Sequence, residues 1–170
     1  MNKTALINGH IYTMAGSVLE KGTLLWEKGK ITAVGEKETL PPDAEVIDLQ
    51  GKTVVPGFVD AHTHLGILEE IYQEEGDDLN EFTEPLTPEM RALDAVNPLD
   101  IAFRDAVCGG ITTVMTGPGS ANVLGGTNLV LKTAGNSLEK MVLLPQSGLK
   151  TAFGENPKRV FSEQKKIPCT

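Results

Sequence analysis

The segment FVDAHTHLG, residues 58–66, contains two of the three histidines of this 170-residue chain, His62 and His64. It follows the β-branched run TVV and a Pro-Gly pair, and this pattern predicts a buried strand that begins near Val54. Because side chains two positions apart on a strand point to the same face, both imidazoles should project together from the strand's C-terminal end. Two imidazoles at that spacing can bind one metal ion through neutral nitrogens. The segment therefore predicts a metal site.

Asp60 lies one strand step before the pair, on the same predicted face. We expect its carboxylate to orient a ligating histidine or to help to hold the metal from outside the first ring of ligands. The alternative is that His62 and His64 are ordinary polar residues at a strand end. The Pro-Gly entry, the apolar lead-in and the closing Gly66 favour the metal site.

Composition excludes several classes of partner. The formal net charge of -8 argues against nucleic acids and anionic membranes, because both bind basic surfaces. No apolar run approaches the roughly 20 residues of a membrane span, and the N-terminus lacks the uninterrupted apolar core of a signal peptide. Cys108 and Cys169 lie far apart and are expected to be free thiols. These features predict a soluble, cytoplasmic protein.

Hydrophobic patterns predict two regions of an α/β fold. Residues 1–55 contain short β-branched runs separated by turn signals, which indicate a small antiparallel sheet. After that region, residues 94–108 have the apolar spacing of a helix, residues 109–116 read as a strand, and residues 140–144 read as another. Strand, helix and strand in this order are typical of a parallel sheet. The Gly-rich residues 117–126 are expected to form a flexible loop at a strand's C-terminal end, bordering the active site.

His10 follows the turn signal Asn8-Gly9, so it is predicted to be a surface residue in a turn. The acidic, Pro-interrupted residues 69–84 are predicted to form a solvated loop.

The motif VVPGFVDAHTHLG resembles the first barrel strand of the amidohydrolase superfamily. The upstream runs ALINGHIYTM, GTLLWEKGKITAVGE and AEVIDLQGKTVVPG are similar to the β-sandwich piece that precedes the barrel in many members. GGITTVMTGPGS resembles the second barrel strand, and GLKTAFGENPKR resembles imidazolonepropionase-like members. The resemblance implies that residues 56–170 form the first βα units of a TIM (β/α)8 barrel, with residues 1–55 as a piece of the small β-sandwich.

The resemblance also implies an activity: hydrolysis of a C–N bond in a small-molecule amide or cyclic amide, with one or two divalent metals, often zinc. His62 and His64 match the family's first-strand ligands. The family bridges its metals with a carboxylated Lys or a Glu, so Lys150 and Glu155 are both candidates. Glu155 is slightly favoured because a carboxylate binds a metal directly, whereas a Lys must first become a carbamate. The competing interpretation of Glu155 is a surface turn that pairs it with Lys158 or Arg159.

The sequence departs from the family pattern in one respect. The family uses two more histidines and an Asp from later strands, whereas the remaining histidine here is His10. We therefore expect the N-terminal part of an amidohydrolase, with a partial site, weak metal affinity and apolar edges that favour a homo-oligomer. Two alternatives stay open: a non-catalytic metal-binding or assembly module, and a β-rich binding protein in which the histidine pair is incidental. The sequence does not identify the substrate.

Overall fold

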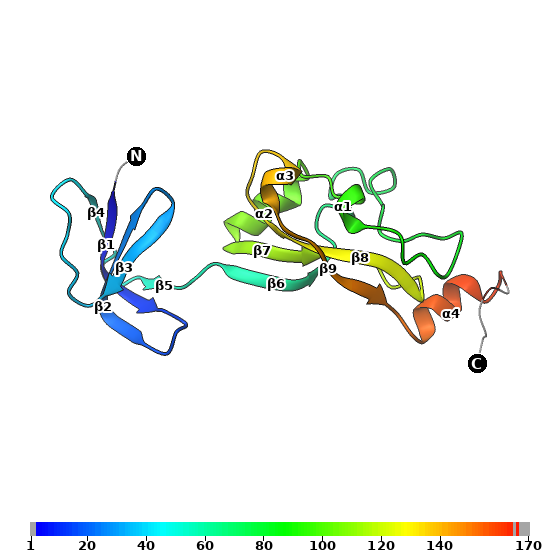
Figure 1. The fold of residues 1–170 in the computed structure, drawn as a ribbon, viewed down its shortest axis with the longest axis horizontal. Helices are drawn as coiled ribbons and strands as arrows, with labels where there is room; N and C mark the ends of the chain where they lie inside the picture. Colours follow the sequence, from blue (N-terminus) through cyan, green and yellow to red (C-terminus); the bar gives the residue numbers. More distant parts are fainter. Residues whose placement is uncertain (1–2, 165, 167–170) are drawn as a thin grey trace. The chain divides into compact units, whose positions relative to one another are not determined.

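A computed structural model describes residues 3–164 and residue 166 of the chain. The chain divides into two compact units, Met1–Pro56 and Gly57–Thr170. Each unit is built on its own sheet, and all the helices belong to the second unit (Figure 1). The structure is therefore mixed α/β. In the part of the chain that the structure describes, no helix is long and apolar enough to cross a membrane.

The first unit is one mixed sheet in the order β3-β2-β1-β4, with β5 also paired to β1. β1, β2 and β3 are antiparallel, as predicted, but β4 and β5 run parallel to β1. The prediction of an antiparallel sheet is therefore wrong for these two strands. The reason is the loop 36–44, which leaves the end of β3 and returns the chain to the start of β1. The strands are β1 (Thr4–Tyr12), β2 (Val18–Glu27), β3 (Lys30–Gly35), β4 (Glu45–Asp48) and β5 (Thr53–Val54).

His10 lies within β1 and not in a turn, so its predicted position is wrong. The Asn8-Gly9 pair is absorbed as an irregularity of the strand, because Asn8 has a positive φ of 56° and the β1–β2 register shifts there. The His10 ring is half-buried and stacks on Tyr12 with ring centroids 4.9 Å apart. A turn-forming dipeptide can thus interrupt a strand without ending it.

The second unit has a four-stranded sheet in the order β6-β7-β8-β9. β6 and β7 are parallel and are connected through α2, which confirms the predicted strand-helix-strand unit. β8 is antiparallel to both β7 and β9. The expectation of a parallel sheet is therefore wrong for this part of the unit. The elements are β6 (Phe58–Thr63), α1 (Ala92–Ala95), α2 (Ile101–Cys108), β7 (Ile111–Thr116), β8 (Leu124–Lys132), α3 (Leu138–Met141), β9 (Val142–Thr151) and α4 (Glu155–Phe161).

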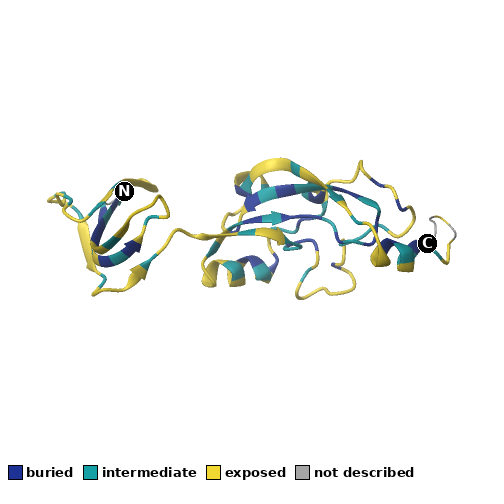
Figure 2. Cartoon of the chain, turned by 90° about the horizontal axis from the view of Figure 1, so that it is seen from below, coloured by how far each residue is buried: buried dark blue, intermediate teal, exposed yellow. Residues whose placement is uncertain are grey.

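The core of the second unit lies between one face of this sheet and the helices. Burial alternates along β7 and β8, so every second residue enters the core (Figure 2). On the helix side, Asp100 caps α2 by accepting a hydrogen bond from the backbone N–H of Ala102. The core residues are Ile67, Ala92, Val96, Phe103, Val114, Leu129, Leu131 and Met141.

Several predicted boundaries differ in the structure. The single helix over 94–108 is two helices, because Pro98 and the residue before it, Asn97, disfavour continued helix. Residues 124–126, expected in a loop, open β8 instead. The strand expected over 140–144 is β9, which begins at Val142 after the short helix α3 and continues to Thr151.

The strand that carries the histidine pair also begins later than predicted. Val54 pairs with Ile11 in the first unit's sheet, and β6 begins only at Phe58. β6 is the edge strand of the second sheet, and it is not buried: Phe58 is 58% exposed and Val59 is 68% exposed. An apolar run that looks like a buried strand is therefore a strand with only one neighbour among the described residues.

Candidate metal centre

The two histidines lie at the C-terminal end of β6, His62 inside the strand and His64 just beyond it. Two side chains shape the backbone here, since Asp60 Oδ1 accepts from the His62 N–H at 3.0 Å and Thr63 Oγ1 accepts from the Leu65 N–H at 3.2 Å. The imidazole centroids are 5.7 Å apart, with their planes at 81°. The rings therefore meet edge to face on one side of the chain.

The protonated nitrogen of His64 is fixed by its partner. Its Nδ1 lies 2.7 Å from the carbonyl oxygen of Gly117, which follows β7. Because a carbonyl oxygen can only accept, Nδ1 carries a proton and donates it, and in the neutral ring the free lone pair is then on Nε2. A hydrogen bond of this kind orients a metal-binding histidine in many proteins.

Lys150, near the end of β9, reaches the same place. Its Nζ lies 3.4 Å from Nε2 of His62 and donates to it, so an ammonium group stands where the imidazole lone pair points. β6 and β9 are three interstrand steps apart in the sheet order, which is roughly 14 Å in a flat sheet. The side chains of His62 and Lys150 both line one cavity, and their contact places a cation beside His62.

The cavity itself has a volume of about 260 Å³. It opens on the face of the sheet away from the helices, because its β8 residue, Asn128, alternates with the buried Leu129. The residues that matter for its chemistry are His62, Met115, Gly117, Asn128, Lys150 and Thr151.

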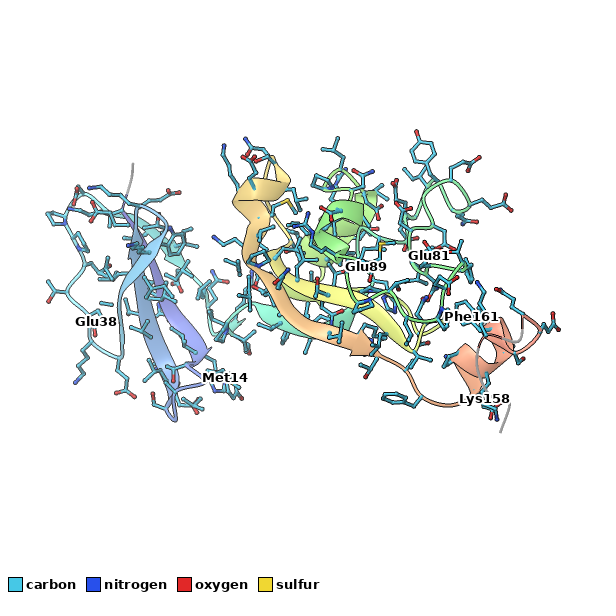
Figure 3. The ribbon with its side chains drawn as sticks, turned by 45° about the vertical axis from the view of Figure 1, so that its right-hand side comes forward. Met14, Glu38, Glu81, Glu89, Lys158 and Phe161 are labelled. Carbon is cyan, nitrogen blue, oxygen red and sulfur yellow. The ribbon has the colours of Figure 1, made fainter. Side chains whose placement is uncertain are left out.

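Glu155 and Asp60 do not line this cavity. Glu155 begins α4 and is exposed, and its Oε1 lies 3.1 Å from Nζ of Lys158. α4 buries Phe161, while Lys158 lies at its outer side (Figure 3). The Asp60 carboxylate binds the backbone of His62 and not an imidazole nitrogen. The structure thus brings Lys150 to His62 and keeps Glu155 in a surface ion pair.

The distance between the two imidazole rings is compatible with one shared divalent ion. Zinc–nitrogen bonds of about 2.0–2.1 Å put the centroids of two imidazoles on the same ion roughly 5–6 Å apart, and the observed separation is 5.7 Å. The ammonium of Lys150 lies beside Nε2 of His62, on the side where a metal ion bound to that nitrogen would lie. Within the described residues, no group of three or more His, Cys, Asp or Glu side chains gathers around a common point.

Sequence reasoning missed Asn128 as a cavity residue, whereas Gly117 belongs to the segment that was expected to border the active site. Asn128 lies in the run GGTNLVLK, whose two glycines hid the start of β8. The alternation of Asn128 with Leu129 and Leu131 was the signal available in the sequence.

Comparison with known proteins finds similarity to amidohydrolases. A model of the "Amidohydrolase family" matches residues 45–108. The amidohydrolase tasK of Hapsidospora irregularis is 34% identical over 163 residues, which are 88% of this chain and 17% of that protein. An imidazolonepropionase of Fusobacterium nucleatum is 52% identical over 48 residues, 26% of this chain and 12% of that enzyme.

The crystal structure of an amidohydrolase from Thermotoga maritima MSB8 matches 98% of this chain with a TM-score of 0.90 and 44% identity. The chain covers 43% of that structure, so it spans less than half of the length of each of these relatives. The mixed α/β unit and the paired histidines at the end of a parallel strand agree with these similarities. The chain belongs to the amidohydrolase superfamily.

Proposed function

We propose that the chain carries part of the metal centre of a hydrolase that cleaves a C–N bond in an amide or a cyclic amide. The observation that carries this proposal is that His62 contacts both the ring of His64 and the amine of Lys150, at a cavity that His62 and Lys150 line. Relatives named as an amidohydrolase, a dihydroorotase and an imidazolonepropionase support it. In this proposal residues 56–170 are the first βα units of a TIM (β/α)8 barrel, and residues 1–55 belong to a β-sandwich.

His62 and His64 would hold a divalent ion, most simply zinc, through neutral nitrogens. His64 is already in the tautomer that this role requires, because its Nδ1 proton is donated to Gly117. A bound divalent ion would supply Lewis acidity toward a substrate carbonyl and a water of lowered pKa. The chain's own residues fix the imidazoles and shape the cavity that receives a small-molecule amide.

Lys150 is the better candidate for the third ligand. In its neutral form the Nζ lone pair can attack the carbon of carbon dioxide, which forms an N–C bond and, with loss of a proton, leaves a carbamate. The carbamate carries a negative charge and two oxygens, so it changes Lys150 from a competing cation into a metal ligand. The 3.4 Å contact with His62 supports this role, and the distant ion pair of Glu155 with Lys158 supports none for Glu155.

The experiment is a zinc titration by calorimetry in bicarbonate buffer, with hydrolysis assays on cyclic amides and acyl-amino acids. We expect His62→Ala and His64→Ala each to weaken zinc binding by at least about tenfold, as removal of a ligand should. His10→Ala is the matched control, because His10 is the remaining histidine and lies in the other unit. Equal losses in all three variants, or none, would contradict the proposed centre.

A second candidate function follows from the small number of ligands. The described residues bring no group of three His, Cys, Asp or Glu side chains together, so a non-catalytic metal-binding or assembly module derived from an amidohydrolase is the alternative. Zinc binding that depends on His62 and His64, without turnover of any substrate in the panel, would favour this alternative over the hydrolase.

A further inference from the structure

Asn128 occupies the floor of the candidate metal cavity. It lies on β8 opposite Gly148 of β9, while Lys150 lies opposite Gly126. Residues directly opposite in an antiparallel pair share a face, so Asn128 and Lys150 project from the same face as diagonal neighbours, with Cα atoms roughly 7–8 Å apart. Leu129 projects from the other face and is fully buried. The side chain of Asn128 therefore belongs to the chemistry of the cavity and not to the core.

Glycines lie on both flanks of the Asn128 carboxamide, and Gly117 is packed closely against it. A side chain at position 117 would collide with Oδ1 of Asn128, whereas a Cβ at position 148 would lie 3.8 Å from its Nδ2, an ordinary contact. The side-chain hydrogen bonds at the cavity join His64 to Gly117 and Lys150 to His62. Across residues 3–164 and 166, no side-chain hydrogen bond uses the Asn128 amide. A donor and an acceptor thus stand side by side with no protein partner.

A carboxamide has a defined complement. Its N–H donor and C=O acceptor lie in one plane and on one edge, so a partner with the same pair in reverse order can form two parallel hydrogen bonds. The cis CO–NH group of a lactam or a cyclic imide provides that edge. The trans amide of an open-chain substrate has its N–H and C=O on opposite sides, so it can form only one of the two bonds.

We propose that Asn128 is the specificity-determining residue of the cavity and that it selects substrates with a cis amide in a ring. The inference rests on the proposed function, since it assigns the substrate of that same site. Asn128 holds the ring by its amide edge, while Lys150 and His62 line the same cavity. A pairing group that leaves unmatched polar atoms with the wrong ligand is a strong source of discrimination.

The test follows the side-chain amide signal of Asn128 by ¹H–¹⁵N NMR in the full chain. The probe is 2-pyrrolidinone, a small lactam with a cis CO–NH edge. N-methyl-2-pyrrolidinone, which lacks the N–H, and N-methylacetamide, which is trans, are the controls. We expect the Asn128 signal to shift saturably with 2-pyrrolidinone, and the controls to bind at least about tenfold more weakly, as loss of one hydrogen bond predicts. Equal binding of the three probes, or no response at Asn128, would overturn the proposal.

Two pairs of variants check the geometry. Asn128→Asp keeps the shape but replaces the donor by an acceptor, and we expect at least about a tenfold loss of 2-pyrrolidinone affinity. Gly117→Ala should displace the carboxamide and cause a similar loss, whereas Gly148→Ala, the same change where a Cβ fits, should cause less than a twofold change. Full affinity in Asn128→Asp would overturn the proposal even if Gly117→Ala failed to fold.

Zinc titration of the same samples separates this inference from the proposed function. Lactam binding at Asn128 without zinc binding would overturn the metal centre and leave the role of Asn128 standing. Zinc binding that depends on His62, with an unresponsive Asn128, would overturn the role of Asn128 and leave the metal centre standing.

Discussion

The two faces of the second unit's sheet are made by the same strands but hold different kinds of residue. On the helix side, Val114, Leu129 and Leu131 are at most 2% exposed and pack with α1, α2 and α3. On the other side, Asn128 and Lys150 line the cavity. Because the side-chain period of a strand is two, adjacent residues such as Asn128 and Leu129 fall on opposite faces.

One short strand such as β8 can therefore contribute to stability through one face and to binding through the other. The core face buries apolar area, which supplies most of the free energy of folding. The cavity face carries polar groups that would be costly inside a core without partners. Substitutions on the first face should therefore change the free energy of unfolding, and substitutions on the second should change binding.

The largest expected effect is on the core face. Leu129→Ala removes a fully buried side chain and should lower the free energy of unfolding by about 2–5 kcal/mol. The control is Val130→Ala, the next residue, which is half-buried on the cavity side and should cost about 1 kcal/mol or less. Urea denaturation followed by circular dichroism measures both values. Equal losses would show that the two faces do not differ as described.

A smaller effect is expected where the core face's longest helix begins. Asp100 is 6% exposed, and its Oδ1 accepts from the N–H groups of Ala102 and Glu70. Asp100→Ala leaves both donors without this partner and should lower the free energy of unfolding by about 1–2 kcal/mol. Asp100→Asn retains an acceptor oxygen and should cost less. Denaturation curves in which Asn is as harmful as Ala would argue against the cap.

The smallest effect concerns the edge strand that carries the histidines. Val59 of β6 is 68% exposed beside a strand edge, and such edges favour pairing between chains. Val59→Lys should lower self-association with little change in stability, because a charge on an edge strand opposes pairing. Light scattering over a range of concentrations measures the average mass. If the average mass of the native chain and of Val59→Lys depends equally on concentration, the edge of β6 is not the surface of self-association.

Parts of the fold were predictable from local patterns. The β6-α2-β7 unit follows from apolar spacing in residues 58–63, 101–108 and 111–116, which the sequence shows directly. The direction of β8 and β9 was not predictable in this way, because strand direction depends on loops and on tertiary pairing. The glycines of residues 124–126 resembled a loop, although they begin a strand in which glycine leaves room for the backbone of Met90.

The candidate site was likewise predictable from the sequence only in part. The spacing of His62 and His64 predicted two neighbouring rings, since it follows from the strand period alone. The choice between Lys150 and Glu155 could not be made from sequence, because both follow the same apolar run. Strand β9 carries Lys150 to the cavity, whereas the chain leaves the sheet before Glu155 and begins α4. Chemistry favoured the carboxylate, and geometry favours the lysine.

The most direct test of the metal centre compares these two residues. Zinc affinity is measured by competition with a chromophoric chelator, with and without bicarbonate, in the native chain, in Lys150→Arg and in Glu155→Gln. Arginine keeps the positive charge but has no neutral amine to form a carbamate. We predict that bicarbonate raises the zinc affinity of the native chain and of Glu155→Gln by at least about tenfold, in line with gain of a charged ligand, and leaves Lys150→Arg unchanged. A loss of zinc affinity in Glu155→Gln with none in Lys150→Arg would contradict the account.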